Sequence, residues 1–305
     1  MKLGEPLVSV LIGRVSTIEP GRIIEVLQAL RAQDLAAAHE VIVVDRRQDE
    51  WTERMAREFP EVRLLPCDAG LPLPAMRNLA LEAAAGEFVV VTEDHCVPGP
   101  TWLRTVSDVF REHPSATAIA GAVENGSTAS AVDAATYLCE YAEFTPPIVD
   151  GPSERLCGVN IAYRRAALLQ VPVELRRGAF WETAVDPYLR RSGATLLATN
   201  RLRVEHRKRI PLRSFLAHRF AYSRQFAGSR FPPRSWLRRA VAATLAPALP
   251  IVLVARMARS AARSPAVARA LPAAAPFLLV FFVAWALGEL VGYSCGPGSA
   301  LAEVE

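Results

Sequence analysis

Four consecutive residues, Glu93, Asp94, His95 and Cys96, bring carboxylates, an imidazole and a thiol together directly after an apolar run at residues 88–91. A β-branched run that ends shortly before a Pro-Gly-Pro segment (98–100) is typical of a buried strand leading into a loop. Open α/β sheets bind their ligands at the carboxyl ends of such strands. Oxygen ligands with a histidine suit a divalent cation that holds a diphosphate, and the alternative is a solvated acidic loop. The spacing of these residues by itself leaves both interpretations open.

The elements that must position these residues follow an alternating pattern. We expect strands at residues 7–12, 40–44, 62–65 and 88–91, and helices at 20–32, 51–58 and 74–85. This alternation predicts an α/β fold with a mostly parallel central sheet and helices on both faces. Farther along, we expect helices at 102–112 and 181–192, and strands at 117–120, 156–163, 194–198 and 201–205. Past Pro211 the chain becomes basic and helical.

The composition of the chain indicates which class of binding partner it suits. The chain has 305 residues, is 51% hydrophobic and carries a net charge of +4. Residues 201–239 contain 12 Lys or Arg against a single acid, Glu205, which suits phosphate groups or an anionic membrane surface. We expect no nucleic-acid partner, because the sequence has no helix-turn-helix, zinc-finger or base-stacking motif. Five cysteines without CxxC pairs indicate free thiols in a reducing compartment.

Two apolar stretches lie near the end of the chain. Residues 240–255 are short for a membrane span, which needs about 20 residues, whereas residues 270–293 are long enough. Four arginines lie between them, and a crossing by both stretches would place these charges opposite the N-terminal part, against the positive-inside rule. We therefore expect 240–255 at the interface and 270–293 across the membrane, with a two-helix hairpin as the alternative. The N-terminus has no signal-peptide pattern, so we expect the N-terminal domain in the cytoplasm, at the cell membrane.

In these features the sequence resembles the family 2 glycosyltransferases, which have the nucleotide-sugar-binding GT-A fold, over roughly residues 6–225. Six motifs occur in the family's order: the strand at 8–12, the segment 39–45, Ala75-Met76-Arg77-Asn78 with 84–88, 93–95, 158–160 with 164–165, and 181–182 ahead of 189–193. The resemblance implies a GT-A-type domain at residues 1–230. A basic juxtamembrane segment and a membrane-associated helical region would then occupy residues 231–305.

The resemblance also implies roles for individual residues. Asp45 falls where the family reads the nucleotide base, and Arg77 and Asn78 fall on a segment that faces the nucleotide. Glu93, Asp94 and His95 fall on the family's metal motif, which binds Mn²⁺ or Mg²⁺ with the diphosphate. Several positions also have a structural alternative. Arg77 could instead cap helix carbonyls or pair with a carboxylate at the end of the sheet, and His206, a candidate for metal or diphosphate contact, could be a solvated histidine. Asn160 could position the acceptor or sugar or satisfy backbone groups, and Arg219 and Arg224 could clamp phosphates or contact lipid headgroups.

The proton-abstracting residue is assigned in the same way. Glu182 falls on the family's base motif, and this implies inversion at the anomeric carbon. Asp186 is the rival base, because it lies one helical turn later on the same face; its structural alternative is a helix-surface carboxylate before Pro187. The sequence departs from the family in three places: Gly13-Arg14-Val15-Ser16 replaces the usual opening, Arg46-Arg47 follows Asp45, and Glu and His stand in the metal motif where two aspartates are usual.

These features favour a membrane-attached glycosyltransferase that uses a nucleotide-diphosphate sugar and a glycan or polyprenyl-linked acceptor. A catalytically inactive GT-A-like scaffold that binds nucleotide or a partner enzyme is the alternative from another class. A sugar nucleotidyltransferase is disfavoured, because no Gly-rich activating loop follows the first strand. No residue pattern specifies the sugar, the nucleotide base, the acceptor or the oligomeric state.

Overall fold

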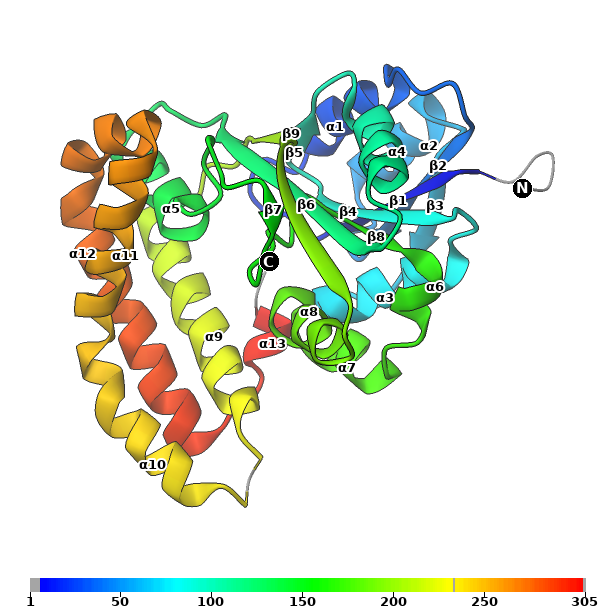
Figure 1. Cartoon of the computed structure of the whole chain (residues 1–305). Helices are drawn as coiled ribbons and strands as arrows, with labels where there is room; N and C mark the ends of the chain where they lie inside the picture. Colours follow the sequence, from blue (N-terminus) through cyan, green and yellow to red (C-terminus); the bar gives the residue numbers. More distant parts are fainter. Residues whose placement is uncertain (1–5, 233, 304–305) are drawn as a thin grey trace. The chain divides into compact units, whose positions relative to one another are not determined.

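The computed structural model describes residues 6–232 and 234–303 (Figure 1). The chain forms two compact units. The first, here called the sheet unit, contains the residues up to Gly126 and Pro146–Arg207; the second, the helical unit, contains Ser127–Thr145 and the residues from Lys208 onward. The sequence suggested one boundary at residue 230, whereas in the structure α5 (Ala131–Tyr141) and α9 (Leu212–Arg230) group with the C-terminal helices.

A mixed β-sheet forms the centre of the sheet unit. Its strands run in the order β3-β2-β1-β4-β8-β6-β9-β5, and β7 pairs with β9. The neighbours β3, β2, β1 and β4 are parallel, as are β6 and β9, whereas β8 is antiparallel to both β4 and β6. The α/β fold expected from the sequence is therefore confirmed, with the parallel strands concentrated in its first half. The strands are β1 (Val8–Arg14), β2 (His39–Asp45), β3 (Arg63–Pro66), β4 (Phe88–Glu93), β5 (Cys96–Pro98), β6 (Ala116–Asn125), β7 (Gly151–Pro152), β8 (Ile161–Arg164) and β9 (Thr195–His206).

Helices pack on this sheet through apolar stripes at helical spacing. In α4 (Trp102–Glu112) the buried side chains include Trp102, Val106, Val109 and Phe110, which fall on one face. The other helices of this unit are α1 (Arg22–Arg31), α2 (Glu50–Glu58), α3 (Leu73–Ala83), α6 (Arg165–Leu169), α7 (Val173–Gly178) and α8 (Trp181–Arg191). Gly193, just past α8, has φ of +85°, the left-handed conformation that ends many helices.

Strand β9 corrects one expectation. The sequence predicted two strands, at 194–198 and 201–205, but the structure has one strand with a register shift against β6 between Gly121 and Ala122. A Cβ atom on Gly121 would lie 1.9 Å from the carbonyl oxygen of Leu202, so only glycine allows this approach of the two strands. The continuous strand carries His206 to a position opposite Cys96 on β5.

The helical unit is built around α12 (Pro265–Cys295), which packs against α5, α9, α10 (Trp236–Leu245) and α11 (Leu249–Arg263). A short 3₁₀ turn, η1 (Ala246–Ala248), joins α10 to α11, and α13 (Ala300–Glu303) follows α12. Two segments, Trp236–Arg263 and Pro265–Cys295, are long and apolar enough to cross a membrane by length and composition. The first is longer than the sequence suggested, because prolines at the starts of η1 and α11 are accommodated in helical first turns.

Candidate functional site

Glu93, His95 and His206 form a compact cluster at the end of β4. A tight turn separates Glu93, the last residue of β4, from Cys96, the first residue of β5. The Nε2 atom of His95 lies 3.1 Å from the Glu93 Oε2 atom and 3.1 Å from the His206 Nε2 atom. The two imidazole rings are nearly perpendicular, at 88°. The β5–β9 pairing thus unites residues 111 positions apart.

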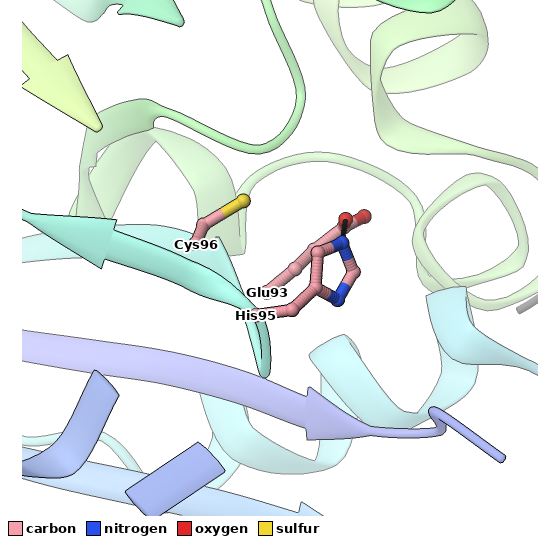
Figure 2. A group of neighbouring side chains, drawn as sticks. All are labelled: Glu93, His95 and Cys96. Atoms are coloured by element: carbon pink, nitrogen blue, oxygen red, sulfur yellow. Dashed lines mark ion pairs between the residues drawn. The ribbon is translucent and has the colours of Figure 1, made fainter. Parts of the chain in front are cut away.

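Within the described part of the chain, ligand atoms of Glu93, His95 and Cys96 lie within 4.8 Å of one another and could hold a metal ion (Figure 2). Cys96 is fully buried, and burial raises the pKa of its thiol well above the ordinary value. Because the thiolate is the form that ligates metals, Cys96 is a poorer donor than the carboxylate and the imidazoles. The donor set is therefore best described as one carboxylate and two histidines.

Asp94, which was also predicted to bind the metal, lies beside this cluster, and both of its carboxylate oxygens have hydrogen-bond partners. Its Oδ2 atom accepts hydrogen bonds from the backbone amides of Val15 (2.9 Å) and Ser16 (3.0 Å). Its Oδ1 atom accepts one from the Ser16 hydroxyl (2.6 Å) and lies 2.8 Å from His95 Nδ1. A carboxylate at Nδ1 favours the tautomer in which Nε2 carries the lone pair. Asp94 therefore fixes the loop after β1 and orients His95 toward Glu93 and His206.

Arg77 joins the cluster to the predicted base. It projects from α3, is 3% exposed, and places Nη2 3.5 Å from Glu93 Oε1 and Nη1 3.7 Å from Glu182 Oε2. Glu182 lies in the first turn of α8, beside Gly158, where a Cβ atom would lie 2.8 Å from Glu182 Oε2. The structure thus brings Arg77, Glu93 and Glu182 together in one site.

Asp186 lies deeper than Glu182 on the same helix. It is 3% exposed and accepts a hydrogen bond from the Tyr163 hydroxyl at 2.7 Å, whereas its Oδ2 atom is buried without a hydrogen-bond partner. The pKa of Asp186 is raised to about 7, chiefly by burial; Tyr163 and Arg77 lower it, and the negative charge of Glu182 adds to the rise. A carboxyl group with this pKa can hold or release a proton near neutral pH.

Asp45 lines a hollow of about 230 Å³ with Asp49 and Thr52, but its carboxylate is already paired. Arg14 Nη1 donates to both oxygens of Asp45, at 3.1 and 3.0 Å, and Thr52 donates to Oδ2 at 2.5 Å. Arg14 is 0% exposed, and its Nη2 also donates to both oxygens of Asp49. A nucleotide base in this hollow would meet a neutralised carboxylate. Base reading by Asp45 remains a prediction.

The two predicted asparagines are engaged inside the sheet unit. Asn160 accepts a hydrogen bond from Trp102 Nε1 and donates to the carbonyl oxygens of Ala122 and Leu202. These are the backbone contacts of the structural alternative, and they hold β6 and β9 beside β8. Asn78 is fully buried and donates to Glu82 at 2.8 Å, one turn along α3.

Arg219 and Arg224 lie on α9, in the helical unit. The guanidinium of Arg219 is 4.3 Å from the Tyr222 ring centroid, 4.4 Å from that of Trp285 and 3.7 Å from the Glu140 carboxylate. Arg224 donates to the carbonyl oxygen of Gly296. Both side chains thus have partners inside this unit, and phosphate clamping remains a prediction.

Sequence reasoning did not assign Arg14, Ser16 or Tyr163 to the site. Arg14 and Ser16 lie in the segment that departs from the family's usual opening, and this departure was the available signal. Tyr163 reads as an ordinary aromatic residue of a strand, and only tertiary packing brings its hydroxyl to Asp186.

Comparisons with known proteins agree with this architecture. A segment is 28% identical over 102 residues, 32% of this chain and 32% of the relative, to the glucosyl-dolichyl phosphate glucuronosyltransferase of Haloferax volcanii, so the match spans about a third of that protein's length. The structure is similar to that of a mannosyltransferase from Pyrobaculum calidifontis in complex with GDP-Man and Mn²⁺, with a TM-score of 0.57 and 20% identity, over 94% of this chain and 87% of that one. This similarity shows a GT-A-type fold. The model of Glycosyl transferase family 2 matches residues 16–169, half of the chain, and the protein therefore belongs to this family of glycosyltransferases.

Proposed function

We propose that this glycosyltransferase moves a sugar, with inversion, from a nucleotide-diphosphate donor to a hydroxyl of a lipid-linked or cell-surface glycan at the cytoplasmic face of the membrane. The observation that carries the proposal is the position of Arg77, between Glu93 of the cation cluster and Glu182 of the proposed base. Transfer requires charge neutralisation at the leaving diphosphate and proton removal from the acceptor, side by side. Arg77 contacts one group suited to each of these two tasks, Glu93 and Glu182.

Glu182 is the proposed general base. Its side chain is 24% exposed, so an acceptor hydroxyl can reach it, whereas Asp186 is nearly inaccessible. Arg77 keeps the Glu182 carboxylate oriented toward the cluster, and a positioned base of this kind contributes typically 10²- to 10⁴-fold to a rate, an order-of-magnitude figure. Asp186 is the second candidate for the base.

The residues of the cluster fit a divalent cation. Glu93, His95 and His206 would hold it, and Asp94 would fix the tautomer of His95. A bound cation would supply charge neutralisation at the leaving diphosphate. A carboxylate with two imidazoles suits Mn²⁺ better than Mg²⁺, which prefers oxygen ligands. The presence of Mn²⁺ and GDP-Man in the related mannosyltransferase supports the choice of cation and of donor class.

Two further observations support a lipid-linked acceptor at a membrane. The relative from Haloferax volcanii is described as acting on a glucosyl-dolichyl phosphate, and the helical unit contains two long apolar segments. The basic block at residues 201–239 would favour anionic phosphates at such a surface.

The test is binding and turnover with the full chain in detergent. Calorimetry with UDP-, GDP- and dTDP-sugars, in Mn²⁺, Mg²⁺ or chelator, should show cation-dependent binding of one donor. Glu182→Gln should keep that binding and lower transfer to a polyprenyl-linked acceptor by at least about 100-fold, whereas Asp186→Asn, the matched control, should lower it far less. The absence of donor binding in every condition would overturn the proposal. Donor binding that is accompanied by no transfer would instead support the scaffold.

A further inference from the structure

We propose that the helical unit binds the surface of an anionic lipid bilayer through one apolar face and does not cross the membrane. Eleven large apolar side chains on α10, α11 and α12 are each 44–74% exposed, and together they are here called the outer face. They are Trp236, Leu237, Val241, Leu245, Ile251, Val252, Val254, Leu279, Val280, Val283 and Leu287. Exposed apolar surface of this extent marks an interaction site.

The other side of α12 is in close contact with α9. A Cβ atom on Gly288 would lie 2.0 Å from Ser223 Oγ, and one on Gly292 would lie 2.5 Å from the Arg224 carbonyl oxygen. These glycines, four residues apart, allow the two helix backbones to approach closely. Near the start of α9, the rings of Phe215 and Phe281 meet at 4.5 Å. Helix α9 therefore accompanies the C-terminal half of α12 along its length.

Helix α9 is unsuited to the interior of a bilayer. It contains five basic or imidazole side chains, Arg213, His218, Arg219, Arg224 and Arg230. Arg219 packs on Trp285, in the apolar part of α12, so a crossing by α12 would carry this arginine into the hydrocarbon. Charged side chains at that depth are costly and rare.

Helix α5 is a second reason why α12 should not cross the membrane. It packs against α12, and Arg263, just before α12, donates to the carbonyl oxygen of Glu143, just after α5. The 11 residues of α5 span about 17 Å, less than the roughly 30 Å of the hydrocarbon core, and the chain enters and leaves α5 from the sheet unit. Binding at the surface avoids both problems, because the outer face enters the lipid while α5 and α9 stay in water.

The charge pattern favours an anionic bilayer over a second copy of the chain. Residues 231–270 contain no acid and seven arginines: 234, 238, 239, 256, 259, 263 and 269. They flank the apolar stretch at both ends, so helices lying in the membrane plane place all of them at the headgroups of one leaflet. A two-fold dimer would pair this face with the same face of a second copy. Because both ends of the apolar stretch carry arginines, the arginines of one copy would then face those of the other, whether the helices ran parallel or antiparallel.

Flotation of the purified chain with vesicles tests the surface. We expect binding to vesicles of phosphatidylcholine with phosphatidylglycerol, and weaker binding to phosphatidylcholine alone. Val283→Asp should weaken binding roughly tenfold or more, because burial of one valine is worth about that factor. Val149→Asp, which changes a still more exposed valine in the sheet unit, is the control and should bind normally. Equal effects of the two variants, or dimers that persist without lipid, would overturn the proposal.

Labelling from one side of the membrane distinguishes surface binding of the helical unit from helices that cross the bilayer. Three variants, each with a single cysteine, would be labelled with an impermeant maleimide in sealed membrane vesicles. The cysteine replaces Ser115 in the sheet unit, replaces Ala262 beside the α11–α12 turn, or is the native Cys295. All three should react from the same side. A reaction of Ala262→Cys only from the opposite side would establish a crossing hairpin, and such a reaction of Cys295 would establish a single span. Either result would refute surface binding even if the glycosyltransferase activity were normal.

Discussion

Asp186 should make the sheet unit less stable as the pH rises, and Asp186→Asn should remove this dependence. Burial raises the pKa of this carboxyl group from 3.8 to about 7 in the folded protein. The difference is about 3 pKa units, and at 1.36 kcal/mol per unit it corresponds to about 4 kcal/mol between the two protonation states. The cost arises because the folded state must either keep the proton or bury a charge with an unpartnered Oδ2 atom.

The sign follows from proton binding. Between about pH 4 and pH 7 the folded state keeps a proton on Asp186 that the unfolded state has released. The free energy of unfolding should therefore fall by about 1.4 kcal/mol per pH unit across this window and level off above it. Asparagine cannot ionise, so the variant lacks this contribution. The stability of the variant relative to the natural chain should rise with pH.

Urea unfolding followed by tryptophan fluorescence measures this difference, because the buried Trp102 and Trp181 both lie in the sheet unit. The two proteins would be compared at several values between about pH 5 and pH 8. Glu154→Gln, at a side chain that is 85% exposed, controls for the loss of one surface charge. A relative stability of Asp186→Asn that stays constant over this range would refute the assignment of a raised pKa to the buried carboxyl group.

Three further outcomes are expected. Asp94→Asn should weaken Mn²⁺ binding in calorimetry by about 10- to 100-fold, because the variant loses the carboxylate that orients His95; unchanged affinity would contradict this role. Arg14→Met should lower the free energy of unfolding by about 3–5 kcal/mol, because it leaves the buried Asp45 carboxylate without its ion-pair partner. If the added change Asp45→Leu restores the stability, the unpaired charge is the cause. Gly121→Ala should cost about 3 kcal/mol in the same assay, because the new methyl group would press on a strand carbonyl, and a variant as stable as the natural chain would be inconsistent with the close approach of β6 and β9.

Local patterns in the sequence predicted much of the sheet unit. Helix α4 has the predicted bounds, because its apolar residues repeat at helical spacing after a Pro-Gly-Pro segment. The strands β1, β2 and β4 were predicted within two residues of their ends, since buried parallel strands appear as continuous β-branched runs. The single strand β9 was missed, because its register shift depends on a glycine in β6, on a different part of the chain.

The sequence suggested several residues of the candidate site but not the contacts between them. Glu93, His95 and Glu182 have side-chain types and positions that suggested chemistry. Their connection through Arg77 depends on how α3 and α8 pack on the sheet, and no sequence spacing encodes it. Asp94 shows the same limit, because its hydrogen bonds to the loop after β1 require the parallel pairing of β1 with β4.

The sequence by itself determined the βα alternation, the acidic end of β4, the basic block and the two apolar stretches, because each depends on composition or on periodicity within one segment. Tertiary structure alone decided that His206 meets His95, that Arg14 neutralises Asp45, and that α9 packs against α12 through Gly288 and Gly292. Each of these contacts joins residues at least 31 positions apart, so it is specified by the packing of whole elements and not by the local preferences of either segment.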